Sequence, residues 1–149
     1  MRVHIATDHA GYELKNYLVE ALTADGHHVV DHGAAAYDAS DDYPDTILPG
    51  AQAVAGDPGS LGIVLGGSGN GENIVANKVP GIRSILAWSD QTARLGREHN
   101  DANVVALGAR MHEPADALEL VRVFLATPFS GDERHQRRID KISAYESRR

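Results

Sequence analysis

The chain has 149 residues, 42% of them hydrophobic and 23% charged, with a formal net charge of −7 and no cysteine. This is the length of one domain with a sizeable core, and the lack of cysteine excludes disulfides, thiolate nucleophiles and thiolate metal sites. An acidic chain without a long apolar run is poorly suited to general nucleic-acid binding or to spanning a membrane, so a cytoplasmic protein is expected.

Short apolar runs alternate along the chain with segments whose apolar residues recur at helical spacing. In order they predict a strand at 3–7, a helix at 12–25, a strand at 28–31, a helix at 45–55, a strand at 61–65, a helix from 70 or 71 to 78, a strand at 83–88, a helix at 89–99, a strand at 103–107 and helices at 113–126 and 132–146. This alternation predicts an α/β fold, a single doubly wound domain over residues 1–149 with helices on both faces of a five-stranded parallel sheet. Ligands of such sheets bind outside the carboxyl ends of the strands.

The most informative stretch is LGIVLGGSGNGENIVANK at residues 61–78, a buried strand that runs into a glycine-rich loop. Glycines let backbone amides converge on one point, so the loop predicts an anion site. It is neither a P-loop, because Glu72 stands at the lysine position, nor a GxGxxG fingerprint. Charge-stabilising amides beside a possible base suit proton removal next to a carbonyl. The structural alternative is a plain strand-to-helix turn, in which Glu72 favours the positive helix end.

Polar side chains also follow other predicted strands. Asp8 and His9 end the first strand and Arg110 follows the last one, so we expect them at the same sheet edge as the glycine loop. Asp8 is equally suited to cap the first helix. His99 and Asn100 close a helix, where a charged imidazole favours the helix dipole. The polar segment 33–44 is long for a connection in an α/β unit, which makes it a candidate functional loop.

The end of the chain is basic, whereas the body is acidic. From residue 134 onward, six basic and two acidic side chains give a net charge of +4, which leaves −11 for residues 1–133. Arg134 and Arg138 are four positions apart on a predicted helix, which is unfavourable for like charges unless something neutralises them. A phosphate is a suitable counter-ion because its oxygens match guanidinium groups, and a solvated basic tail is the alternative.

Together these segments resemble type B ribose-5-phosphate isomerases, a sugar-phosphate isomerase family that includes the galactose-6-phosphate isomerase subunits. The resemblance covers nearly the whole chain and rests on DHAGYELK, DDYP, GGSGNGENIVANKVPG, REHN, GAR and RHQRRI. It points to an actinobacterial-like subgroup, in which the base is a glutamate of the glycine loop rather than a cysteine. It implies interconversion of ribose 5-phosphate and ribulose 5-phosphate through a cis-enediolate, a step of the pentose phosphate pathway.

The resemblance also implies roles for individual residues. Glu72 is the base that moves a proton between C2 and C1, and Ser68 assists proton transfer between the reacting oxygens. His99 with Asn100 helps to open the furanose ring. The remaining positions are Asp8 and Tyr43 for the sugar, Gly67, Gly69, Asn70 and Gly71 for the anion hole, and His9, Arg110, Arg134 and Arg138 for the phosphate.

The family reaction is metal-independent, and no cofactor is expected here. The eight histidines form no HExxH pair, and those at 27, 28 and 32 lie on or beside a strand without clustered carboxylates. Helix-end amides depress the pKa of a carboxylate, so we expect bound substrate to desolvate Glu72 and to raise its pKa.

The expected partners are a sugar phosphate and a second copy of the chain, because family members place each site between two subunits of a dimer. The last helix then reaches the partner's site, and a tetramer is the alternative assembly. Allose 6-phosphate, galactose 6-phosphate or a tetrulose phosphate are alternative substrates for the same mechanism. A non-catalytic nucleotide-binding domain is the alternative of another class, against which Glu72 argues.

Overall fold

The computed structural model describes residues 1–148; Arg149, a residue of the basic tail, lies outside them. Five strands form one sheet in the order β2-β1-β3-β5-β4, and every neighbouring pair is parallel. The strands are β1 (Arg2–Thr7), β2 (His28–Asp31), β3 (Leu61–Gly66), β4 (Ser84–Leu86) and β5 (Val104–Gly108). The five-stranded parallel sheet predicted from the sequence is confirmed.

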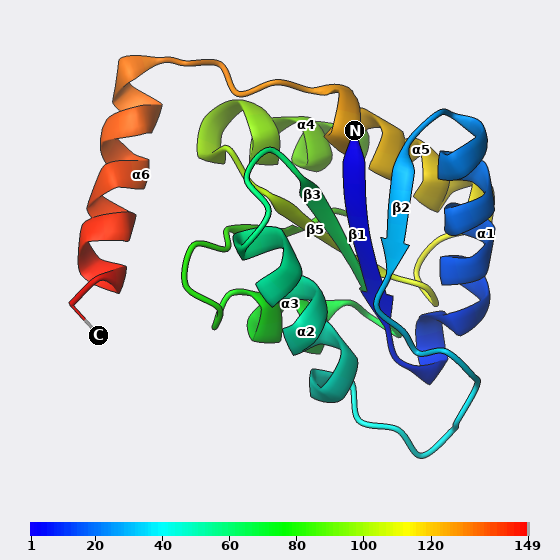
Figure 1. The fold of residues 1–149 in the computed structure, drawn as a ribbon. Helices are drawn as coiled ribbons and strands as arrows, with labels where there is room; N and C mark the ends of the chain where they lie inside the picture. The colour runs from blue at the N-terminus through cyan, green and yellow to red at the C-terminus, as the bar shows by residue number, and fades with distance from the viewer. Residues whose placement is uncertain (149) are drawn as a thin grey trace.

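Helices cover both faces of the sheet (Figure 1). They are α1 (Tyr12–Ala24), α2 (Pro44–Ala55), α3 (Asn70–Ala76), α4 (Asp90–Asn100), α5 (Pro114–Ala126) and α6 (Glu133–Glu146), with a short 3-10 turn η1 (His9–Gly11) after β1. One apolar cluster joins the sheet to α1, α4 and α5, and a second joins it to α2 and α3. No helix among residues 1–148 is both long and apolar enough to pass through a membrane.

The central strand shows why the sequence gives this layering. All six residues of β3 are buried. Ile63 and Leu65 pack into the cluster with α1 and α5, whereas Val64 packs into the cluster with α2. A strand covered on both faces reads as a continuous apolar run, which is the pattern found at residues 61–65.

The fourth strand is shorter than predicted at both ends. Arg83 lies before β4, where its guanidinium group donates to the carbonyl oxygens of Asn100 at 2.8 Å and Asp101 at 2.9 Å. Trp88 lies beyond β4, and its side chain is 67% exposed. The Trp88 backbone N–H donates to Thr92 Oγ1 in the capping box of α4. The predicted strand 83–88 was therefore too long because its end residues serve neighbouring turns.

Helix α3 also ends earlier than the predicted residue 78. The Asn77 side-chain amide donates to the carbonyl oxygens of Asn73 at 3.1 Å and Ser84 at 2.9 Å. This side chain ends the helix and links it to β4, so the chain turns before Lys78.

Helix α6 follows an extended segment and lies beside the layered body (Figure 1). Its buried side chains are His135 and Ile139, whereas Ile142 and Tyr145 are 54% and 65% exposed. The carboxylate of Glu146 accepts a hydrogen bond from the Gly81 backbone N–H at 2.9 Å. The helix predicted at 132–146 is thus present, with Asp132 as its N-cap.

Candidate active site

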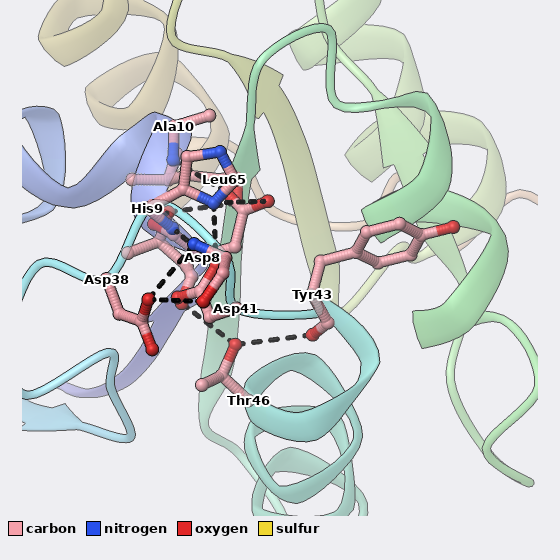
Figure 2. A network of polar contacts seen from close by, with 10 residues as sticks. Asp8, His9, Ala10, Asp38, Asp41, Tyr43, Thr46 and Leu65 are labelled. Atoms are coloured by element: carbon pink, nitrogen blue, oxygen red, sulfur yellow. Dashed lines mark hydrogen bonds and ion pairs between the residues drawn. The ribbon is translucent and has the colours of Figure 1, made fainter.

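The chain changes direction across the sheet between β1 and β3, because β2 lies on one side of this pair and β5 on the other. Such a switch point is where open α/β sheets bind ligands. Thr7 Oγ1 donates to the Leu65 carbonyl at 3.0 Å and joins the carboxyl ends of β1 and β3. Thr46 Oγ1 donates to the Thr7 carbonyl at 2.8 Å, which brings the start of α2 to the same edge (Figure 2).

Glu72 lies in the first turn of α3 and is only 4% exposed. Its carboxylate packs so closely on Gly66 that a methyl group at this glycine would overlap it. Burial raises the pKa of Glu72 and the nearby charge of Asp8 adds to this, while the Glu72 backbone N–H acts in the opposite direction. The protein itself therefore desolvates this carboxylate. Burial in the fold thus already acts in the direction that was expected from bound substrate.

The glycine loop is a tight turn packed against the end of β5. Gly69 has φ of +84° and caps α3, and a Cβ atom there would lie 2.8 Å from the Leu107 carbonyl carbon. The Asn70 backbone N–H donates to Ser68 Oγ at 3.2 Å. The first backbone N–H groups of a helix have no partner within it, so the start of α3 offers donors beside Glu72.

Two predicted residues flank the loop. The Arg110 side chain lies over Gly67, since its Nη1 atom would be 3.0 Å from a Cβ at that glycine. The Arg110 backbone N–H donates to the Gly67 carbonyl at 3.1 Å. On the other side, Tyr43 packs on Gly71, where a Cβ would lie 2.6 Å from the phenol Cζ. A Cβ at residue 71 would force Tyr43 to move, whereas at residue 67 it would meet only the flexible end of Arg110.

Asp8 and His9 complete this edge. Asp8 is 7% exposed and accepts a hydrogen bond from the Ala10 backbone N–H at 3.0 Å. It therefore caps a turn as the sequence suggested, although the turn is η1 and not α1. His9 Nδ1 lies 2.6 Å from Asp41 Oδ1 (Figure 2), and this hydrogen bond is the largest cause of a raised pKa of His9.

Sequence reasoning did not identify Asp41. It is 32 positions from His9, so no local pattern joins the two residues. The available signal was the unusual length of the polar segment 33–44, which contains the DDYP motif.

Asp8, His9 and Asp41 are also the residues at this edge that could hold a cation, since one ligand atom from each lies within 4.8 Å of the others. The sequence reasoning did not foresee this group. His9 and Asp41 already use one nitrogen and one oxygen on each other. The geometry is thus explained by hydrogen bonding within the group.

Four predicted residues lie elsewhere. Helix α4 begins just beyond the carboxyl end of β4 and runs back to the opposite edge of the sheet, where the Asn100 carbonyl meets Arg83. The His99 ring stacks on His135 of α6, with ring centroids 4.2 Å apart and an interplanar angle of 18°. In this chain His99 and Asn100 are therefore not beside Glu72.

The two predicted phosphate-binding arginines of α6 are exposed. Arg134 Nε lies 3.4 Å from the Asp132 carboxylate, and Arg138 lies one turn further along the helix. The structure thus brings Asp8, Tyr43, Glu72 and their neighbours to one edge and places the α4 and α6 residues away from it.

Comparison with known proteins gives consistent matches along the chain. Residues 3–142 match the family described as Ribose/Galactose Isomerase. The ribose-5-phosphate isomerase B of Mycobacterium tuberculosis is 58% identical over 146 residues, which cover 98% of this chain and 90% of that protein.

Solved structures agree with the sequence matches. The ribose-5-phosphate isomerase B of Mycoplasma genitalium with bound ribulose-5-phosphate has a TM-score of 0.94 at 41% identity, covering 98% of this chain and 96% of that one. The type B ribose 5-phosphate isomerase of Trypanosoma brucei has a TM-score of 0.91 at 42% identity, covering 97% of each chain.

Proposed function

This chain belongs to the ribose/galactose isomerase family, and from that premise we propose that it interconverts ribose 5-phosphate and ribulose 5-phosphate through a cis-enediolate. The observation that carries the proposal is the buried Glu72 carboxylate, whose pKa is raised, beside the amides of the glycine loop. A base with a raised pKa removes a proton from carbon more effectively than an ordinary surface carboxylate. A plain strand-to-helix turn would not require a buried glutamate.

The reaction needs one proton to move between two carbons. Glu72 takes the proton from C2 of the open-chain aldose and returns it to C1, so the carboxylate is regenerated at the end of the turnover. The negative charge of the intermediate develops on the sugar oxygens, where donors held in place stabilise it. We assign these donors to the amides of Gly67, Gly69 and Gly71, with Asn70, whose N–H bonds to Ser68 Oγ, acting through that serine.

The oxygens must also exchange a proton, because the carbonyl moves from C1 to C2. We assign this transfer to Ser68. Its hydroxyl oxygen already accepts from the Asn70 backbone N–H, which leaves the hydroxyl proton available to a substrate oxygen. Asp8, on the neighbouring strand end, is placed to bind sugar hydroxyls, and Tyr43 borders the same loop.

The phosphate and the sugar ring require groups that this edge supplies only in part. His9 and Arg110 lie here, whereas His99, Asn100, Arg134 and Arg138 do not. We therefore propose a homodimer in which the last helix and the end of α4 complete the site of the partner subunit, with a tetramer as a further assembly of such dimers. A cytoplasmic location accords with this function, since a phosphorylated sugar is too polar to cross a membrane unaided.

The decisive experiment measures isomerisation of ribose 5-phosphate in the presence of EDTA, for the native protein and for Glu72→Gln. Activity should survive EDTA and fall by a factor of about 100 or more in the variant, the range that general-base catalysis supplies. The matched control is Glu13→Gln, because Glu13 also lies in the first helical turn of its helix but is exposed. This control should retain native activity.

Two results would change the proposal. A native protein that is inactive on ribose 5-phosphate but active on allose 6-phosphate, galactose 6-phosphate or a tetrulose phosphate would keep the mechanism and replace the substrate. A Glu72→Gln variant with activity within about twofold of the native value would remove Glu72 as the base.

A further inference from the structure

Asp41 makes two contacts with His9 through a single oxygen atom. Its Oδ1 lies 2.6 Å from His9 Nδ1 and 3.1 Å from the His9 backbone nitrogen. The side chain of Asp41 is 19% exposed and that of His9 is 24% exposed, so the pair is partly shielded from water. Such a short contact between an ionised carboxylate and an imidazole is a charge-assisted hydrogen bond.

This contact fixes the chemistry of the imidazole. A carboxylate can only accept, so the proton of the hydrogen bond belongs to Nδ1 of His9. The other ring nitrogen, Nε2, is then the atom left to meet a ligand. It accepts when the ring is neutral and donates when the ring is an imidazolium. A phosphate oxygen requires a donor, so only the imidazolium form binds a phosphate through Nε2.

The charges around His9 favour the imidazolium. Asp41 raises the pKa of His9 through the hydrogen bond and its charge, and Asp8, whose Oδ2 lies 3.9 Å from Nδ1, adds to this. Arg110 and partial burial act against it. Asp38 of the same loop also interacts with the charge of His9, and the ring of Tyr37 meets His9 edge-on at 6.2 Å.

The loop that carries Asp41 has other anchors besides its contact with His9. The buried ammonium group of Lys15 donates to Asp31 Oδ2 at 2.6 Å and to the Ala34 carbonyl at 2.9 Å. At the other end of the loop, Thr46 binds the carbonyl of Thr7. Lys15 and Thr46 therefore hold the two ends of the loop. Neither of these contacts accounts for the pairing of Asp41 with His9.

We propose that Asp41 is a positioning residue for the isomerase reaction: it orients the His9 ring and holds it as an imidazolium whose Nε2–H donates to the dianionic phosphate of the substrate. This inference deepens the proposed function and rests on it. The phosphate dianion of the substrate, bound between His9 and Arg110, would also compensate both positive charges. This explains why the imidazolium of His9 is tolerated near the guanidinium of Arg110.

The test compares Asp41→Asn with Asp38→Asn as the matched control. Each variant removes one negative charge from the same loop, but Asp38 bonds only to Ser40 and not to His9. KM and kcat for ribose 5-phosphate are measured between pH 6 and pH 8. Dividing the KM of each variant by that of the native protein at each pH cancels the titration of the substrate phosphate itself.

In Asp41→Asn, KM should rise about tenfold at pH 8 and less than about threefold at pH 6, where His9 protonates without help, with kcat changed less than about twofold. Asp41→Glu retains the carboxylate and should recover part of the native KM. Asp38→Asn loses only a charge interaction with His9 and no hydrogen bond to it, so its KM should change much less than that of Asp41→Asn at pH 8. A KM ratio for Asp41→Asn that is close to one, or that is the same at pH 6 and pH 8, would overturn the inference.

A second measurement separates this inference from the proposed function. The Cε1 proton of His9 is titrated by NMR, with its signal assigned by its loss in His9→Asn. The pKa of His9 should be lower in Asp41→Asn than in the native protein. Inorganic phosphate should shift the His9 signal of the native protein more strongly than that of Asp41→Asn. An unchanged titration would overturn the role of Asp41 even in an active enzyme. Conversely, a native protein that does not isomerise ribose 5-phosphate would refute the proposed function alone.

Discussion

The burial of Glu72 has a consequence for stability as well as for catalysis. Its pKa is raised above the ordinary value of 4.5, so the folded protein binds this proton more tightly than the unfolded chain does. The stability that this group contributes is fully present below the unfolded pKa and is lost as the pH rises through the folded pKa. At neutral pH the ionised carboxylate therefore destabilises the fold that positions it.

Glu72→Gln should accordingly be more stable than the native protein at neutral pH, because an amide carries no charge to desolvate. We expect its Tm at pH 7.5 to be higher by about 2–4 °C, the shift that about 1 kcal/mol produces in a domain of this size. The difference should disappear near pH 4, where Glu72 is protonated. Thermal unfolding of both proteins across this range checks the prediction, and parallel Tm curves would contradict it.

At the scale of the element, strand β3 and helix α3 are joined by the contact between Gly66 and the Glu72 carboxylate. The backbone of Gly66 does not require glycine, since its φ is not positive. The side chain of Glu72 requires it, because a methyl group would displace the carboxylate. Gly66 is therefore constrained by the position of the Glu72 carboxylate, the proposed base.

Gly66→Ala should lower kcat by about 100-fold, since a shift of about 1 Å in a catalytic group costs this much. Overpacking at this site should also lower the stability, by about 1–3 kcal/mol. The control is Gly56→Ala, where a Cβ would meet no atom closer than 3.5 Å. Steady-state kinetics with a denaturation curve for each variant checks both effects, and native kcat in Gly66→Ala would count against the placement of the base.

The elements themselves could largely be predicted from the sequence, because apolar runs and cap residues act locally. Ser89 and Asp132 begin two of the predicted helices, and in the structure both are the N-caps of those helices. Errors arose where a side chain bonds to a distant part of the chain. Asn77 ends α3 by reaching Ser84, and Arg83 leaves β4 to reach Asn100.

In the candidate site, too, features set by local sequence could be predicted, whereas contacts between distant segments could not. The glycine loop with Glu72, and the residues at strand ends, could be predicted because parallel strands bring their carboxyl ends together. The His9–Asp41 pair and the burial of Glu72 could not, since both depend on packing between segments that are far apart in the sequence. In the proposed dimer, the positions of His99 and Arg138 relative to Glu72 would depend on how two chains assemble, which no local pattern reveals.

At the scale of the whole molecule, shared sites can be tested by mixing two inactive proteins. Glu72→Gln lacks the proposed base and Arg138→Ala lacks a proposed phosphate-binding group. In a mixed dimer, one site carries both changes and the other carries neither. Random exchange of equal amounts should therefore restore about a quarter of the native activity. Activity after refolding the mixture checks this, and no recovery despite dimers in solution would contradict the shared site.

If the proposed dimer completes the site, the separation of His99 and the α6 arginines from Glu72 also makes activity depend on the association of two chains. A lone chain would then hold the proposed base but not the complete phosphate pocket. Activity per chain should decline on dilution, and total activity should follow the square of the concentration when dimers are scarce. Because the substrate would bridge both chains, it must tighten their association by the same factor by which association tightens its own binding. The substrate would then act as a linker that assembles the enzyme which consumes it.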